Sequence, residues 1–299
     1  MSQSVLSGQF MAPRGQAVLL VLGAVVLWGF APIGNRYFVG GGLLAMPGAS
    51  YMALRYSIAS LCFLPGLIGA MQSWSMRDWL RGAVCGLSGV GAYNLLAGIA
   101  GRTVSAGMTG LLNSSESLMI LLLACLAARR APRGHTLFAA FLGAAGIALL
   151  ALSAGKAQGD IRGIVLLLLG ALGWAVYCVV IPPLIEKHGA LQSSAVTMSI
   201  GTVPLLIAGA PGLGPMMTVM TGREWEILIF LAIGSSVVAL IAWNKGVATL
   251  GAQTAGWFLY LLPVFSVLGG AALLGERLTL AEFAGGAMIL GSVYLAQRG

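Results

Sequence analysis

The chain has 299 residues, of which 59% are hydrophobic and 8% are charged, and its mean hydropathy is +0.95. A soluble domain carries roughly 25% charged residues because water must wet its surface, so this composition excludes a soluble fold and indicates a chain solvated by lipid. The net charge of +8 comes mainly from Lys and Arg in short segments between apolar runs, which argues for orientation across a membrane and against a nucleic-acid partner.

Apolar runs of about 20 residues, the length that crosses a bilayer, recur along the whole chain. We expect an all-α integral membrane protein with ten transmembrane helices, at about 16–38, 48–71, 79–100, 105–127, 135–154, 163–186, 193–210, 224–247, 252–274 and 281–296. The connections are too short for a soluble domain, so we expect residues 1–299 to form a single membrane domain. Arg129, Arg130 and Arg133 form a dense basic cluster on the side of the N-terminus, so we expect both termini in the cytoplasm.

The sequence repeats itself at about half its length. Residues 77–79 read Arg-Asp-Trp, and 146 positions later residues 223–225 read Arg-Glu-Trp. The same offset pairs Trp28 with Trp174. The repeats are predicted at about 16–154 and 163–296, with five spans each, and because five is odd the second copy must insert upside down. Inverted repeats around a central cavity are typical of secondary transporters that work by alternating access.

Prolines interrupt several of the expected spans, and kinks or hinges form at such positions. The candidate hinges are Pro65, Pro204 and Pro263. The first repeat differs at one of them, because an offset of 147 places Glu116 opposite Pro263.

Several stretches resemble a known family. They are WG at 28–29, LRY at 54–56, GWA at 173–175, AWN at 242–244, LPV at 262–264 and GERLT at 275–279. On these residues the chain is similar to EamA-type proteins of the drug/metabolite transporter superfamily. Residues 174–178 and 242–246 also resemble stretches of YddG-type aromatic amino-acid exporters. The resemblance implies ten helices in a bacterial-type inner membrane, with a central cavity for export of amino acids or similar metabolites.

Glu116 is the acidic residue that the sequence places deep in the bilayer, where an uncompensated charge is costly. It could hold a substrate ammonium, couple transport to protons, or be a neutral acid that bonds to neighbouring helices. Asn113 lies about one helical turn before it. Arg55 could pair with Glu116 or grip a substrate carboxylate. Lys245 could contact substrate, or its amine could reach the headgroups.

Aromatic residues deep in the spans suit flat apolar side chains and organic cations alike. The candidate residues of the substrate cavity are Trp28, Tyr93, Asn94, Asn113, Glu116, Trp174, Tyr177, Trp243 and Tyr260. Trp74, Trp79 and Trp225 are instead predicted to be anchors at the membrane interface.

The sequence shows no carboxylate pair, Cys/His cluster or phosphate-binding loop at useful spacing. We therefore expect no catalytic residue, no metal and no cofactor, and energy from a gradient or from the substrate's own concentration difference. The favoured function is a secondary transporter that exports amino acids, aromatic ones included, and related metabolites by alternating access. The alternatives are a cationic drug efflux transporter, a sugar-phosphate exchanger, and a non-transporting scaffold or intramembrane enzyme. The expected partners are a small-molecule substrate and lipid; a monomer is compatible with the sequence, which leaves the oligomeric state open.

Overall fold

The computed structural model describes residues 13–39, 46–104, 109, 112–113, 115–153, 161–265 and 280–298. Within these ranges the chain is almost entirely helical and contains no β-strand. This agrees with the helical membrane fold that the composition predicts. The GERLT motif at 275–279 and parts of the fourth and ninth expected spans lie outside the described residues.

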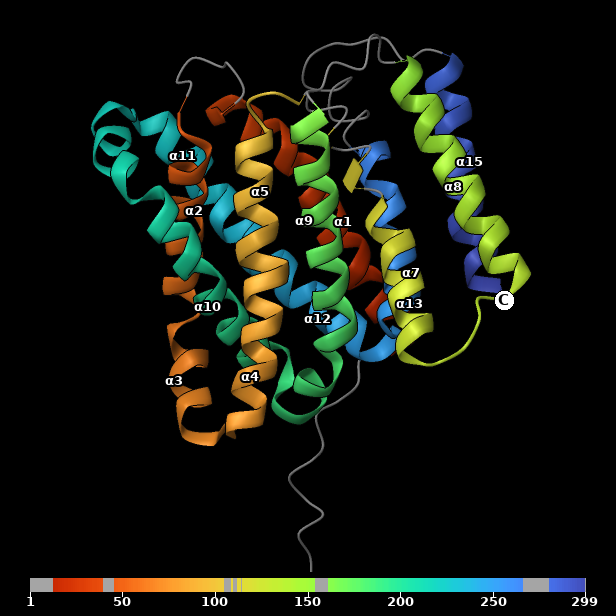
Figure 1. Cartoon of the computed structure of the whole chain (residues 1–299), viewed down its shortest axis with the longest axis horizontal. Helices are drawn as coiled ribbons and strands as arrows, with labels where there is room; N and C mark the ends of the chain where they lie inside the picture. Colours follow the sequence, from red (N-terminus) through yellow and green to blue (C-terminus); the bar gives the residue numbers. More distant parts are fainter. Residues whose placement is uncertain are drawn as a thin grey trace, which may run out of the picture.

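The helices run in chain order as follows (Figure 1). The first half contains α1 (Arg14–Val39), α2 (Gly48–Cys62), α3 (Leu64–Ser73), α4 (Met76–Cys85), the π-helix η1 (Gly86–Ala92), α5 (Tyr93–Ala100), α7 (Ser115–Ala127) and α8 (Gly134–Ser153). The second half contains α9 (Ile161–Val180), α10 (Pro182–Val219), α11 (Gly222–Phe230), the π-helix η2 (Leu231–Val238), α12 (Ala239–Leu250), α13 (Ala252–Trp257), the 3₁₀-helix η3 (Phe258–Leu261) and α15 (Leu280–Arg298).

Five continuous helical segments in the described part are long and apolar enough to cross a membrane. They are Arg14–Val39, Met76–Ala100, Ile161–Val180, Pro182–Val219 and Gly222–Leu250. Together α2 and α3 would make a sixth, bent by 65°. The chain is therefore a helical bundle with several membrane-spanning candidates.

Prolines and one glycine set boundaries that the hydropathy pattern placed differently. The second expected span breaks at Phe63, between α2 and α3, with Pro65 in the first turn of α3. Proline is tolerated in a first turn but disrupts a helix interior, so the new helix begins there. The sixth expected span ends at Val180, because Pro182 opens α10. Inside α10 the chain kinks at Gly189, whose φ of 80° favours glycine.

The other two candidate hinges lie within helical backbone. Pro204 is inside α10, and Pro263 lies in the helical turn that follows η3.

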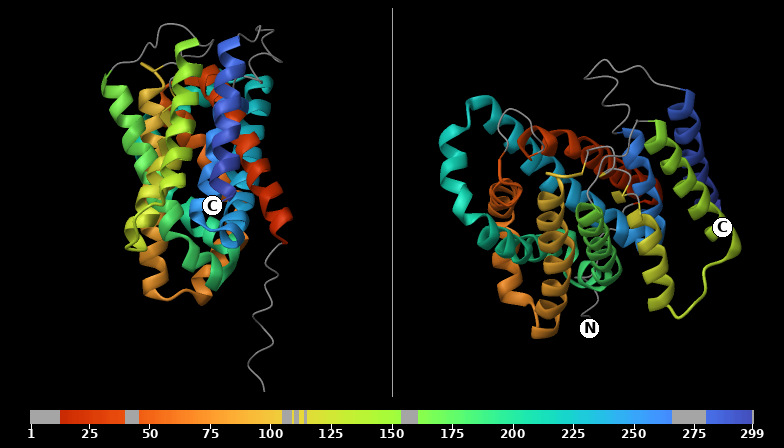
Figure 2. Two further views of the ribbon diagram at one scale, coloured as in Figure 1. Left: turned by 90° about the vertical axis from the view of Figure 1, so that its right-hand side faces the viewer. Right: turned by 45° about the horizontal axis from the view of Figure 1, so that its top comes forward.

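Helices far apart in the sequence pack in pairs. The pairs are α1 with α12, α2 with α10, α5 with α9, α7 with α13, and α8 with α15. The pair of α8 and α15 lies at the right-hand edge of the bundle in Figure 1 and faces the viewer in the left view of Figure 2. At one end of the bundle, called the α3–α4 end, α3 meets α4. At the opposite end α1 finishes at Val39 and α5 at Ala100 (Figure 1).

Glycines allow α10 to lie directly against η1. A Cβ placed on Gly201 would come 2.5 Å from the carbonyl oxygen of Gly86, and a Cβ on Gly86 would come 2.6 Å from the carbonyl oxygen of Thr197. Backbone atoms cannot move aside as a flexible side chain can. This contact therefore fixes the two halves of the chain at close range.

Two local structures recur at the spacing of the sequence repeat. Ser75 and Asp78 form a capping box at the start of α4, and Thr221 and Glu224 form one at the start of α11. The π-helices η1 and η2 follow about ten residues later in each half. Such turns are rare and are frequent at functional sites, so their recurrence in both halves is informative.

Candidate substrate cavity

A cavity of about 140 Å³ lies between helices of both halves of the chain. Trp28 and Pro32 of α1, Met52 and Arg55 of α2, and helices α5, α9 and η2 contribute to its wall. The lining includes Val39, Gly101 and Val104, so the cavity extends toward the end of the bundle opposite the α3–α4 end. Its wall is mostly apolar with a few polar groups, as in ligand pockets generally.

Arg55 places a buried guanidinium at the cavity wall, with 3% of the residue exposed. Its Nε donates to Ser236 Oγ at 3.1 Å, Nη2 to Ser235 Oγ at 2.9 Å and Nη1 to Asn35 Oδ1 at 3.0 Å. The guanidinium carbon lies 5.4 Å from the ring centroid of Tyr56. Three of its five N–H groups are thus used by these partners.

Glu116 places a carboxyl group at the same cavity, with 2% of the residue exposed. It lies in the first turn of α7. The Tyr93 hydroxyl is within hydrogen-bonding reach of this carboxyl, while Oε1 has no partner in the described ranges. Buried polar groups without partners are uncommon in folded proteins and call for an explanation.

Arg55 and Glu116 do not form an ion pair in the structure, and neither pairs with another charged residue within the described ranges. Sequence reasoning favoured a structural pair between them. The three neutral partners of Arg55 instead hold the guanidinium against η2 and α1. The cavity wall therefore carries a guanidinium and a carboxyl group that are not paired with each other.

Tryptophans close the cavity toward the α3–α4 end. The rings of Trp28 and Trp174 meet edge to face with centroids 5.3 Å apart, and Trp243 lies 5.3 Å from Trp28 and 5.9 Å from Trp174. Tyr93 approaches Trp174 at 6.0 Å. Trp28 is further fixed because its Nε1 donates to the carbonyl oxygen of Ser235 at 2.8 Å.

The candidate residues divide into two groups. Those that line the cavity are Trp28, Arg55, Tyr93, Asn94, Asn113, Glu116 and Trp174. The others lie outside its wall. Tyr177 and Trp243 are buried behind Trp28 and Trp174, Tyr260 donates to the carbonyl oxygen of Ala140 on α8, and Lys245 is exposed.

Sequence reasoning missed the partners of Arg55. Ser235 and Ser236 form a polar pair in the middle of an apolar run, which is a signal that could have been used. Asn35 also accepts a hydrogen bond from Tyr51 at 2.7 Å, so it connects two side chains of α2. Its role depends on the packing of α1 against α2 and is not visible in the sequence alone.

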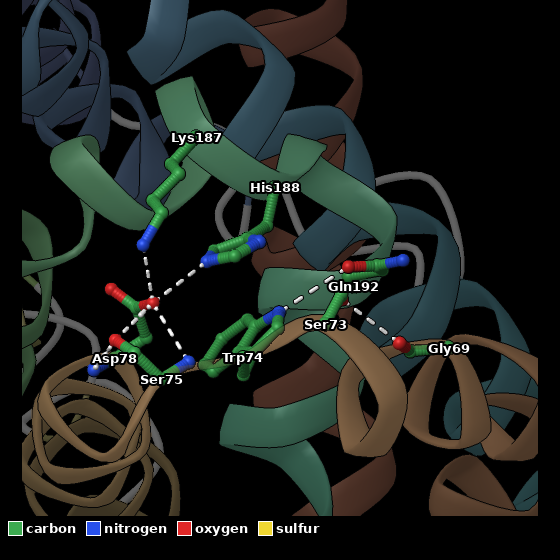
Figure 3. Close-up of polar contacts among 8 residues, drawn as sticks. All are labelled: Gly69, Ser73, Trp74, Ser75, Asp78, Lys187, His188 and Gln192. Atoms are coloured by element: carbon green, nitrogen blue, oxygen red, sulfur yellow. Dashed lines mark hydrogen bonds and ion pairs between the residues drawn. The ribbon is translucent and has the colours of Figure 1, made fainter.

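At the α3–α4 end, polar side chains connect the two halves of the chain (Figure 3). Lys187 Nζ lies 2.6 Å from Asp78 Oδ2, and His188 Nε2 lies 3.2 Å from the same oxygen. The indole of Trp74 stacks on His188 with centroids 4.7 Å apart, and its Nε1 donates to Gln192 Oε1 at 3.3 Å. We call these five residues the Asp78 cluster.

The environment of Trp74 differs from the one predicted for a membrane anchor. The residue is 8% exposed, since α3 and α4 fold back onto the start of α10. Its ring contacts Trp79 and would also contact a Cβ on Gly82.

Glu224 makes a related contact at the opposite end of the bundle. It occupies in the second half the position that Asp78 occupies in the first, 146 residues later. Tyr37 of α1 donates to Glu224 Oε1 at 3.1 Å. Each half thus contributes one capping carboxylate that accepts a hydrogen bond from the other half, and the two contacts lie at opposite ends.

Comparison with known proteins decides the family. The EamA-like transporter family matches the chain twice, over residues 15–152 and 161–297. The chain belongs to the EamA-like transporter family. EamA-like proteins are multi-pass membrane transporters, so this one is not an enzyme.

Relatives of this EamA-like protein carry transporter names. "Uncharacterized transporter YdfC" of Bacillus subtilis is 27% identical over 249 residues, covering 82% of this chain and 79% of the relative. "Probable terminal-alkyne amino-acid exporter" of Streptantibioticus cattleyicolor is 26% identical over 286 residues, covering 95% and 94%. A solved crystal structure matches with a TM-score of 0.76 at 19% identity, covering 96% of this chain and 98% of the other. That likeness shows the fold alone.

Proposed function

We propose that this EamA-like protein is a secondary transporter that exports amino acids, with aromatic ones favoured, by alternating access. The observation that carries the proposal is the pair of separated charged groups, Arg55 and Glu116, in one apolar cavity between the two halves of the chain.

The two charges suit a zwitterion. A guanidinium with free N–H groups binds a carboxylate through charge-assisted hydrogen bonds. A carboxylate with an unpartnered oxygen accepts hydrogen bonds from an ammonium. Both groups are buried, so each interaction is stronger than it would be in water. The relative named as a probable amino-acid exporter is consistent with this substrate class.

The aromatic rings at the base of the cavity suit the side chain of the substrate. Trp28, Tyr93 and Trp174 all line the cavity, and the ring of Trp174 lies 5.3 Å from that of Trp28 and 6.0 Å from that of Tyr93. An aromatic side chain would pack against them in offset or edge-to-face geometry. The same rings, together with Glu116, also favour a second candidate function, efflux of flat organic cations.

The proposed architecture is ten helices in two inverted repeats, and the helix pairs support it. A twofold axis in the membrane plane exchanges the first span with the sixth and the third with the eighth. It therefore converts the contact of α1 with α12 into that of α9 with α5, and both contacts are present. The pairs α2 with α10, α7 with α13 and α8 with α15 are each converted into themselves.

The Asp78 cluster and the contact between Tyr37 and Glu224 are the proposed gates of alternating access. When both termini lie on the cytoplasmic side of the inner membrane, the α3–α4 end faces the cytoplasm. The cavity then extends toward the outside, and the Asp78 cluster holds the cytoplasmic end closed. Both contacts are formed in this structure, so export requires the Asp78 cluster to separate while the contact between Tyr37 and Glu224 stays formed, and then the reverse.

The test is counterflow in proteoliposomes with labelled phenylalanine, threonine and methyl viologen. Glu116→Gln is compared with wild type at two pH values, and Glu226→Gln, which alters an exposed acid on α11, is the matched control. We expect phenylalanine counterflow in wild type and the control, and its loss in Glu116→Gln. Retained counterflow with lost pH dependence would assign Glu116 to proton coupling. Normal transport of every substrate by Glu116→Gln at both pH values would refute the site.

A further inference from the structure

A cluster of buried polar side chains lies behind the tryptophans. Asn244 of α12 is fully buried, and its Nδ2 donates to the Tyr177 hydroxyl at 2.7 Å and to Ser194 Oγ at 2.8 Å. Within the described part of the chain its Oδ1 has no partner, and neither has the Oγ of Ser193, the residue before Ser194. We call Tyr177, Ser193, Ser194 and Asn244 the Asn244 cluster.

The amide of Asn244 has one polar atom without a hydrogen-bond partner in either orientation of the amide. Both of its partners are hydroxyl groups, which can donate or accept. Exchanging the amide oxygen and nitrogen would therefore leave the nitrogen in the unpaired position instead. One polar atom of a fully buried side chain is thus available to a ligand in either case.

Two indole N–H groups near the cluster are also unpaired. Trp174 Nε1 and Trp243 Nε1 are buried and have no hydrogen-bond partner among the residues that the structure describes. Trp174 stacks on Tyr177 with centroids 4.9 Å apart, which joins the indoles to the cluster. In lipid an unpaired buried polar group is costly, and such groups mark substrate pathways.

The helices place this cluster one turn beyond the cavity. Trp174 of α9, Met198 of α10 and Leu240 of α12 all line the cavity. About one turn closer to the α3–α4 end, the same three helices carry Tyr177, Ser194 and Asn244. Three helices thus bring polar groups to one depth, between the cavity and the Asp78 cluster.

We propose that the Asn244 cluster is a second substrate site, which binds the charged head group of the amino acid when the bundle is open to the α3–α4 end. Asn244 supplies its unpaired amide atom, and the two indoles supply donors for a carboxylate. The inference rests on the proposed function, because it assigns a second site to the amino acid that the central cavity is proposed to bind. Separation of the Asp78 cluster exposes the site from that end.

The test measures transport constants for phenylalanine from each side of vesicles of known orientation. Asn244→Leu keeps the side-chain size and removes the hydrogen bonds. Ser292→Ala is the matched control, because Ser292 is also fully buried but bonds within its own helix, α15. We expect Asn244→Leu to raise the half-saturating concentration about tenfold from the α3–α4 side and to leave the opposite side unchanged, while Ser292→Ala behaves as wild type.

The inference would be overturned if the half-saturating concentrations of Asn244→Leu equalled those of wild type on both sides. An equal rise on both sides, which signals a structural role, would also overturn it. A second variant, Asn244→Cys in a background without the native cysteines, keeps the inference testable if Asn244→Leu fails to fold. Phenylalanine should protect this cysteine from an impermeant thiol reagent applied at the α3–α4 side, and absence of protection contradicts the site. Absence of phenylalanine transport in wild type refutes the proposed function instead.

Discussion

Removing the negative charge of Asp78 should open the α3–α4 end. Its Oδ2 accepts from Lys187 and lies near His188, both on α10, while the rest of its contacts belong to the cap of α4. Asp78→Asn keeps the size of the side chain but weakens both contacts to the other half of the chain. The state open at this end should therefore become more populated.

The burial of Asp78 and Lys187 sets how much free energy their contact contributes. The side chain of Asp78 is 6% exposed and that of Lys187 is 56% exposed. Exposed pairs contribute about 0.2–1 kcal/mol, whereas removal of one partner from a fully buried pair costs about 3–5 kcal/mol. This half-exposed pair lies between them, at about 1–2 kcal/mol. Because 1.4 kcal/mol is a factor of ten, the population of the open state should rise about 5- to 30-fold.

Cys178 provides the assay. It is fully buried on α9, next to Tyr177 of the Asn244 cluster. With the other native cysteines replaced, an impermeant thiol reagent added at the α3–α4 side should label Cys178 about 5- to 30-fold faster in Asp78→Asn. Lys187→Gln should also speed the labelling of Cys178. The double variant Asp78→Asn with Lys187→Gln should change the free energy of opening by less than the sum of the two single changes.

Glu186→Gln is the matched control for this experiment, since Glu186 is an exposed acid beside Lys187. It should label at the wild-type rate. A rate in Asp78→Asn within about twofold of wild type, or an equal increase in Glu186→Gln, would refute the role of the cluster. Melting temperatures equal to that of wild type in all variants would exclude loss of the α4 cap as the cause of faster labelling.

Three further substitutions test other parts of the structure. Gly201→Ala should lower the free energy of unfolding by about 1–3 kcal/mol, because the added Cβ would meet the carbonyl oxygen of Gly86. The loss should appear as a lower melting temperature in detergent. Gly134→Ala should keep the wild-type melting temperature, because a Cβ at Gly134 has open space. Arg55→Lys should weaken phenylalanine transport about tenfold, because one ammonium cannot replace three directed hydrogen bonds; unchanged half-saturation would contradict this. Glu224→Gln should weaken the opposite gate and speed labelling of a cysteine in the cavity from that side only; labelling at the wild-type rate argues against that gate.

The sequence predicted the repeat well, because the features that carry it are local. Ser75 with Asp78 and Thr221 with Glu224 are capping boxes, which depend on residues three positions apart. The apolar runs likewise predicted most helices. The break at Phe63 was missed, because hydropathy is continuous across it while Pro65 ends one helix and starts another.

The lining of the cavity was predicted in part, while its role as a substrate site stays a prediction. Glu116 and Trp174 were found because a charge or an indole deep in an apolar run is conspicuous. The unpaired state of Arg55 was not, because it depends on α1 and η2 bringing Asn35, Ser235 and Ser236 to one side chain. Such contacts join residues up to 181 positions apart, and no local pattern encodes them.

The central claim is that the cavity binds both charges of an amino acid. Competition in the phenylalanine counterflow assay tests it directly, with phenethylamine, which lacks the carboxylate, and 3-phenylpropionate, which lacks the ammonium. The account predicts that phenylalanine competes at least about tenfold better than either analogue, since each loses a buried charge-assisted hydrogen bond. Competition by phenethylamine as strong as that of phenylalanine would contradict it and favour a transporter of organic cations.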